Sequence, residues 1–128
     1  MNLLLDTHTL LWWHDNPKEV SSKALDAIRN EENNVFISVV NAWEMQIKSQ
    51  LNRLTLPRGL EEIFSIEMSD NSFSLLKVEL PHVYTLNALP LHHNDPFDRL
   101  LISQAKAENL TLVSIDGDFE RYDVALLW

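Results

Sequence analysis

Short runs of apolar residues alternate along the chain with longer stretches in which apolar residues recur at helical spacing. The runs Leu3–Leu5, Val35–Ile37 and Leu112–Val113 contain no polar residue. Such runs are typical of strands buried on both faces in the middle of a parallel sheet. The strands predicted from these patterns are residues 2–6, 35–37, 73–78, 111–115 and 124–127.

The stretches between these strands carry the start and stop signals of helices. Ser38 and Asp95 are preferred N-cap residues, Pro96 suits the first helical position, and Asn52 tolerates the left-handed backbone that often follows a helix. The helices predicted are residues 7–14, 22–30, 39–51, 58–68, 81–89 and 96–108. In the third of these, a buried stripe is expected at Val40, Trp43, Ile47 and Leu51.

The order of these elements predicts the fold class. Strands that alternate with helices require right-handed crossovers, so we expect an α/β fold with a central parallel sheet and helices on both faces. With 128 residues, the chain is expected to form one domain spanning residues 1–128. The first apolar run is too short for a signal peptide or a membrane span, so we expect no membrane partner and a cytoplasmic location.

Composition and charge exclude several classes of site. The absence of Cys rules out disulfides and thiolate metal ligands. The two glycines form neither a P-loop nor a dinucleotide-binding fingerprint. The net charge of −9, from 10 basic and 19 acidic residues, argues against a broad phosphate-binding surface. An acidic chain of this kind favours a basic partner, a divalent cation, or both, although a merely solvated acidic surface is the simpler interpretation.

Two of the predicted strands, far apart in the sequence, run up to an aspartate, namely Asp6 and Asp116. The carboxyl ends of parallel strands meet at one edge of a sheet, which is where ligands bind in open α/β folds. Asp98 lies in the first turn of the helix that precedes the second of these strands, and Glu44 borders the buried face of the helix after residues 35–37. Four carboxylates are therefore candidates to meet at this edge.

A cluster of four carboxylates requires compensation. Two like charges 5 Å apart repel by roughly 3 kcal/mol at an effective dielectric of about 20. Either the groups are not clustered, or some are protonated, or a cation lies among them. Oxygen ligands alone suit a hard ion, Mg²⁺ or Mn²⁺, which can activate water and stabilise charge on a phosphoryl group.

Each acid also has a purely structural interpretation. Asp6 can cap the helix that follows it, and Glu44 can pair with Lys48 four residues later. Asp98 can simply stabilise the helix dipole, and Asp116 can belong only to a turn. The residues His92, His93 and Asp95 invite a transition-metal interpretation, but adjacent histidines in a loop rarely point the same way, which favours a structural or solvated role.

The motifs together resemble the PIN-domain ribonucleases, and specifically the VapC-like toxins of bacterial toxin–antitoxin pairs. The resemblance rests on four segments that occur in the family's order, residues 3–13, 38–48, 93–102 and 112–116. The run from Asp95 to Leu101, Asp-Pro-Phe-Asp-Arg-Leu-Leu, is specific to one branch of the family.

This resemblance implies a three-layer α/β/α fold around a parallel sheet and Mg²⁺- or Mn²⁺-dependent endoribonuclease activity on an RNA substrate. According to this resemblance, the family's acidic site residues correspond to Asp6, Glu44, Asp98 and Asp116. The Ser or Thr that precedes the last acid in the family corresponds to Ser114. It also implies a homodimer and a cognate antitoxin that blocks the site.

Two other functions stay open from the sequence. A phosphatase with an aspartate nucleophile typically carries a second Asp two residues later, where this chain has His8. A PIN-like binding module without activity is the non-enzymatic alternative, and the presence of all four carboxylates disfavours it.

Overall fold

The computed structural model describes all residues, 1–128, and places β1 (Asn2–Leu5) at the centre of a five-stranded parallel sheet. The strand order is β3-β2-β1-β4-β5, in which the other strands are β2 (Asn34–Ser38), β3 (Ser74–Leu76), β4 (Thr111–Val113) and β5 (Leu126–Leu127). All neighbouring strands pair in parallel. This arrangement confirms the predicted α/β fold with a central parallel sheet.

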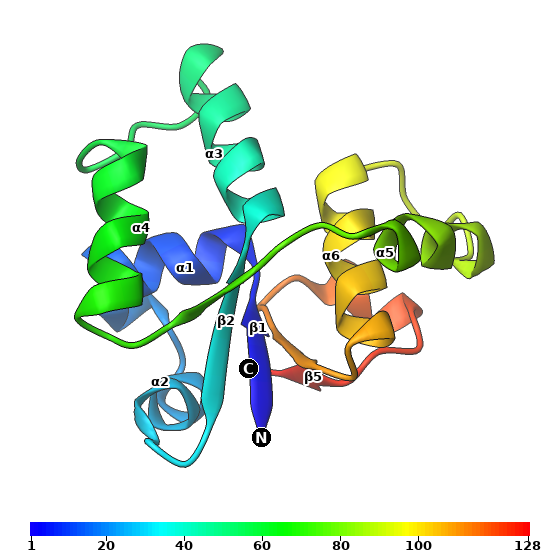
Figure 1. The fold of residues 1–128 in the computed structure, drawn as a ribbon, viewed down its shortest axis with the longest axis horizontal. Helices are drawn as coiled ribbons and strands as arrows, with labels where there is room; N and C mark the ends of the chain where they lie inside the picture. Colours follow the sequence, from blue (N-terminus) through cyan, green and yellow to red (C-terminus); the bar gives the residue numbers. More distant parts are fainter.

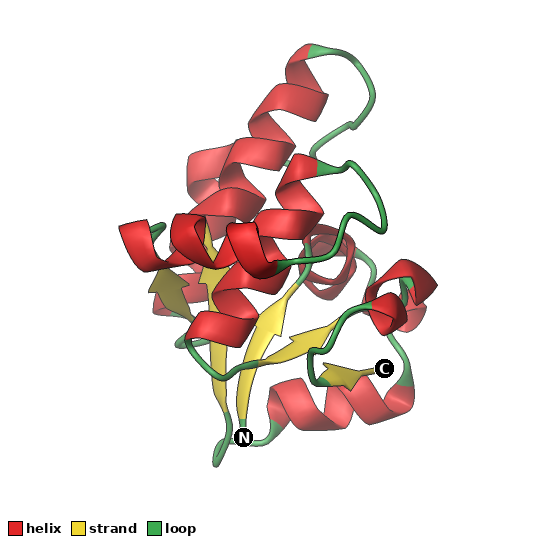
Figure 2. Cartoon of the chain, turned by 90° about the vertical axis from the view of Figure 1, so that its right-hand side faces the viewer, coloured by secondary structure: helices red, strands yellow, loops and turns green.

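Helices cover both faces of the sheet (Figures 1 and 2). The six α-helices are α1 (Thr7–Asp15), α2 (Ser22–Arg29), α3 (Val39–Gln50), α4 (Leu60–Ser69), α5 (Leu80–Thr85) and α6 (Pro96–Ala107). Two short 3₁₀ turns lie between helices, η1 (Pro17–Glu19) after α1 and η2 (Leu86–Ala88) after α5, and a third, η3 (Gly117–Arg121), lies between β4 and β5. Figure 1 shows α1, α2 and α4 on one side of the strands and α5 and α6 on the other. None of the helices is long and apolar enough to cross a bilayer.

The apolar run of β1 contributes side chains to the hydrophobic cores on both faces of the sheet. Leu3 and Leu5 belong to the core beneath α1, α2 and α4, whereas Leu4 belongs to the core beneath α6. All three side chains are completely buried. Because successive side chains of a strand point to opposite faces, only a strand covered on both faces accepts an apolar residue at every position.

A buried polar cluster ties α1 to α4. The Glu67 carboxylate, which is 2% exposed, accepts hydrogen bonds from Trp13 Nε1 at 2.9 Å and Asn71 Nδ2 at 2.6 Å. His14 Nδ1 lies 2.6 Å from its other oxygen. Three partners for one buried carboxylate hold the two helices in a fixed relation.

The predicted stripe on α3 was partly wrong. Val40 is buried, but Trp43 is 50% exposed and Leu51 is 55% exposed. The buried face instead runs through Val40, Asn41, Glu44 and Met45. Trp43 packs its ring edge-on against Phe97 of α6, with ring centroids 4.8 Å apart. The buried face of α3 therefore contains polar residues, and these support the site described below.

Other element boundaries differ by a few residues. β4 ends at Val113 instead of residue 115, and the predicted helix 81–89 is divided into α5 and η2. Asn52 has φ 56°, which confirms the left-handed backbone expected after α3.

Candidate active site

Asp6 is held rigidly at the carboxyl end of β1. The residue is 5% exposed, and its carboxylate caps α1 by accepting a hydrogen bond from Thr9 N at 2.8 Å. Its second oxygen accepts a hydrogen bond from Ser114 Oγ at 2.5 Å. Burial raises the pKa of Asp6, and the hydrogen bonds from Ser114 and Thr9 oppose that rise. The capping role is thus confirmed, and it leaves the carboxylate at the sheet edge where a ligand would bind.

Ser114 joins the ends of β1 and β4. Leu5 is paired with Val113, so the next residues, Asp6 and Ser114, emerge side by side. Besides donating to Asp6, Ser114 Oγ accepts a hydrogen bond from Asp116 N at 3.0 Å. Asp116 itself caps η3 by accepting a hydrogen bond from Asp118 N at 2.9 Å. The predicted turn at Asp116 is therefore present.

Glu44 is fixed by neighbours on two helices. Its side chain is buried and accepts a hydrogen bond from Thr7 Oγ1 at 2.6 Å. The other carboxylate oxygen forms the expected ion pair with Lys48. Asn41 Nδ2 supports the arrangement by donating to Thr7 Oγ1 at 3.1 Å. Thr7 and Asn41 were not singled out from the sequence, although Asn41 completes the capping box of α3 with Ser38.

The pKa of Asp98 reflects both its burial and the acids near it. It lies in the first turn of α6, whose N-cap Asp95 accepts hydrogen bonds from Phe97 N at 2.9 Å and from Asp98 N at 3.0 Å. Burial raises the pKa of Asp98 to about 8, with further contributions from the charges of Asp95, Glu44, Asp6 and Asp116, in that order. Burial is therefore the main cause of the raised pKa of Asp98, and the neighbouring acids add to it.

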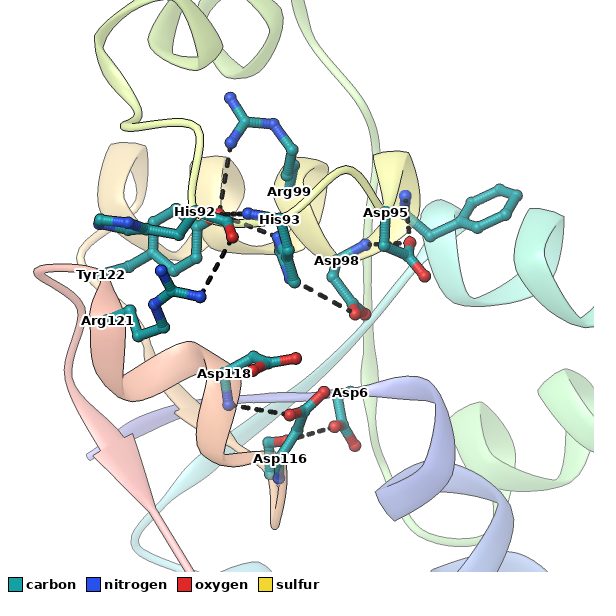
Figure 3. Close-up of polar contacts among 12 residues, drawn as sticks. Asp6, His92, His93, Asp95, Asp98, Arg99, Asp116, Asp118, Arg121 and Tyr122 are labelled. Atoms are coloured by element: carbon teal, nitrogen blue, oxygen red, sulfur yellow. Dashed lines mark hydrogen bonds and ion pairs between the residues drawn. The ribbon is translucent and has the colours of Figure 1, made fainter.

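The arrangement is open at its centre. Figure 3 shows the side chains of Asp6, Asp98 and Asp116 around a common space, with Asp118 beside them. No group of three or more His, Asp or Glu side chains lies close enough together to hold an ion by direct ligation alone. Mg²⁺ is commonly held by one or two carboxylates and retains several waters, so an all-oxygen site of mutually repelling acids fits a hydrated ion of this type.

One surface pocket lies beside the acids, and a larger one lies away from them. A pocket of about 280 Å³ adjoins Glu44 and is lined by Thr7, His8, Leu11, Glu44, Lys48, Arg53 and Leu54. Lys48 and Arg53 give its rim two cationic groups. The larger hollow, of about 510 Å³, is lined partly by Asn33, Asn34 and Ser74 at the amino ends of β2 and β3. It therefore lies at the opposite edge of the sheet from the acids.

Comparison with models of known protein families assigns this α/β chain to one of them. The PIN domain family model matches residues 3–125. The chain therefore belongs to the PIN domain family. No curated protein sequence is detectably similar to it.

Solved structures with the same fold include members of the VapBC family of toxin–antitoxin systems. One is VapBC2 from Rickettsia felis bound to a DNA fragment from its promoter, with TM-score 0.74, 19% identity, and coverage of 99% of this chain and 98% of that chain. Another is VapBC-1 from nontypeable Haemophilus influenzae, with TM-score 0.67, 17% identity and coverage of 99% and 97%. FitAcB from Neisseria gonorrhoeae gives TM-score 0.62, 19% identity and coverage of 98% and 96%. At these identities the likeness shows the fold.

Proposed function

We propose that this chain is a divalent-metal-dependent endoribonuclease that acts as the toxin of a toxin–antitoxin pair. The observation that carries the proposal is that Asp6, Asp98 and Asp116 face a common space at the sheet edge (Figure 3). Burial first, and then the charges of neighbouring acids, raise the pKa of Asp98 to about 8, which agrees with this arrangement. Membership of the PIN domain family supports nuclease activity. The metal identity, the RNA substrate and the site residues are our assignments.

Asp6, Asp98 and Asp116 are proposed to hold Mg²⁺ or Mn²⁺, directly or through water. Glu44 acts as a further ligand or positions the attacking water. Ser114 supports the site by orienting the Asp6 carboxylate, to which it donates a hydrogen bond. An ion held by these residues would lower the pKa of a bound water and offset charge on the scissile phosphate.

The partner proposed for this chain is a cognate antitoxin with a basic segment. Two of the structural neighbours named above, VapBC2 and VapBC-1, belong to the VapBC family of toxin–antitoxin systems. The net charge of −9 suits a cationic partner, because complementary charge accelerates association and favours the correct partner. A homodimer of the single PIN domain, residues 1–128, is proposed as the toxin's assembled form.

RNA must approach this acidic surface through local cations. Lys48 and Arg53 on the rim of the pocket beside Glu44 are the candidates. Arg99 is a weaker candidate for binding RNA, because its guanidinium is already hydrogen-bonded within the protein. Its Nη1 donates to Pro90 O at 2.8 Å and to Tyr122 Oη at 3.3 Å.

The test is cleavage of a mixed pool of structured RNAs by the purified chain with Mn²⁺, with chelator, and with the Asp98→Asn variant. We expect cleavage that requires both the metal and Asp98. Asp6→Asn should also abolish cleavage while leaving the fold intact, because it removes a repelling charge. Undiminished metal-dependent cleavage by a folded Asp6→Asn variant would refute the site. If a folded wild-type chain cleaves nothing and binds no Mn²⁺ in calorimetry, the chain is a binding module.

A further inference from the structure

The loop that precedes α6 holds a histidine whose ring faces the acidic site. The His93 side chain is 16% exposed, and its Nε2 atom is buried without a hydrogen-bond partner. That nitrogen lies 3.8 Å from Asp98 Oδ2 (Figure 3). Buried polar atoms are nearly always paired, so an unpaired one beside a carboxylate requires an explanation.

Tyr122 determines where the proton of His93 lies. The Tyr122 hydroxyl accepts hydrogen bonds from His93 N and from Arg99 Nη1, each at 3.3 Å. A tyrosine hydroxyl can donate only one hydrogen bond, and here both available acceptor positions are used. Its proton therefore goes to the remaining partner, His93 Nδ1, which lies 2.9 Å away.

This hydrogen bond selects one tautomer of the imidazole ring. In a neutral histidine one ring nitrogen accepts and the other carries the proton. With Nδ1 accepting from Tyr122, the proton lies on Nε2, the atom that faces Asp98. We propose that His93, fixed by Tyr122, donates a hydrogen bond from its Nε2–H group to Asp98 and thereby positions that carboxylate for metal binding. The inference rests on the proposed function, because it presupposes that Asp98 is a metal ligand.

Each of the other three acids of the site already accepts a hydrogen bond from a neighbouring donor. Asp6 accepts from Ser114, Glu44 accepts from Thr7, and Asp116 accepts from Asp118 N. The carboxylate of Asp98 accepts no hydrogen bond in the structure, and His93 Nε2 is the donor nearest to filling that place. A movement of roughly 1 Å brings the two atoms to the usual distance of about 2.9 Å. Such bonds are often long in a ligand-free site and tighten in the functional complex.

The ring is held firmly enough to act in this way. Tyr122 is 5% exposed, and its ring centroid lies 5.4 Å from that of His93. Phe119 contacts the imidazole edge-on, with ring centroids 6.4 Å apart. Arg99 links Tyr122 to the loop through Pro90 O. A side chain fixed on several sides can transmit its orientation to the carboxylate it faces.

The first experiment measures the tautomer in metal-free protein by long-range ¹H–¹⁵N NMR, at a pH where the His93 ring is neutral. We expect the proton on Nε2 in the wild type, and a mixture of tautomers in Tyr122→Phe, which keeps the ring but loses the hydroxyl. A wild-type ring with its proton on Nδ1 would overturn the inference without reference to metal or activity.

The second experiment measures Mn²⁺ affinity by calorimetry for four variants. His93→Ala should weaken binding by about 10- to 100-fold, the usual effect of removing a residue that orients a metal ligand. His93→Gln, whose amide can place a donor near the position of Nε2, should recover most of the loss. His92→Gln changes the neighbouring histidine and should bind like the wild type. The double variant His93→Ala/Tyr122→Phe should bind no more weakly than His93→Ala, because Tyr122 acts through His93.

The outcomes separate this inference from the proposed function. If the wild type binds Mn²⁺ and His93→Ala binds equally well, the inference is overturned and the nuclease proposal stands. Failure of His93→Gln to recover affinity, or an added loss in the double variant, overturns it as well, because either result assigns the effect to packing. A folded wild type that binds no Mn²⁺ overturns the proposed metal site and the role of His93 together.

Discussion

Replacing Asp98 with Asn should change how the stability of the metal-free protein depends on pH. The pKa of Asp98 is raised from 3.8 to about 8, first by burial and then by neighbouring carboxylates. A carboxyl group whose pKa is higher in the folded state binds its proton more tightly there. Its stabilising contribution is complete below about pH 4 and is lost as the pH rises towards 8. Asn has no such proton to lose.

The magnitude follows from linkage. One pKa unit corresponds to about 1.4 kcal/mol, so the free energy of unfolding of the wild type should fall by up to about 1.4 kcal/mol per pH unit because of Asp98. Between pH 5 and pH 8 the stability of Asp98→Asn should therefore rise relative to the wild type by up to about 4 kcal/mol. This is a large part of the 5–15 kcal/mol typical of a domain. Asp6, whose pKa is also raised, leaves a residual slope of the same sign in the variant.

Urea unfolding at a series of pH values from 5 to 9, in the presence of chelator, measures this difference. The curves for the two proteins should separate up to about pH 8 and run parallel above it. Adding Mn²⁺ at pH 8 to 100 times its dissociation constant should then stabilise the wild type by about 2.7 kcal/mol and Asp98→Asn by less. A stability difference that stays constant from pH 5 to pH 9 would refute the assigned pKa and, with it, the crowding of carboxylates around Asp98.

Three further predictions concern other parts of the molecule. Ser114→Ala should destabilise the protein by about 1–3 kcal/mol in urea unfolding and slow RNA cleavage, because the buried Asp6 loses one of its two hydrogen-bond donors. Glu67→Leu should also cost about 1–3 kcal/mol in urea unfolding, because it removes the acceptor that joins α1 to α4. Arg53→Gln should weaken binding of single-stranded RNA, measured by fluorescence anisotropy with chelator present, and reduce the magnitude of its salt slope by about 1.

Matched variants control two of these experiments. Glu62 is an exposed acid on the same helix as Glu67, so Glu62→Leu should change stability by no more than about 0.5 kcal/mol. Arg58 is exposed and lies outside the pocket that contains Arg53, so Arg58→Gln should leave RNA affinity unchanged. Equal losses in the Arg53 and Arg58 variants would indicate a general charge effect. Unchanged stability and cleavage in Ser114→Ala would contradict a supporting role for that hydroxyl.

The parallel sheet and the placement of its acids could be predicted because both depend on local pattern. Leu3–Leu5 and Leu112–Val113 are continuous apolar runs, and parallel pairing puts the residues after them at one edge. Asp98 and Asp95 could be placed because helix-start preferences are strong over a few residues. These signals need no knowledge of distant contacts.

The buried face of α3 could not be predicted in the same way. Val40, Trp43 and Ile47 have helical spacing, but so do Asn41, Glu44 and Met45, and the latter contain polar residues that lower their apparent tendency to be buried. They are buried because Asn41 and Glu44 hydrogen-bond to Thr7. The link between His93 and Tyr122 spans 29 residues and likewise leaves no local pattern.

The position of β1 has a consequence for the time at which the site forms during synthesis. β1 is made well before its pairing partner β4, and Ser114 lies 108 positions after Asp6. Pairings between distant segments form late. A chain interrupted before residue 111 lacks β4, one of the two strands that pair with β1. Fragments from aborted translation therefore lack a complete acidic edge. If the chain is the nuclease proposed above, its site can therefore be complete only after translation has passed Asp116.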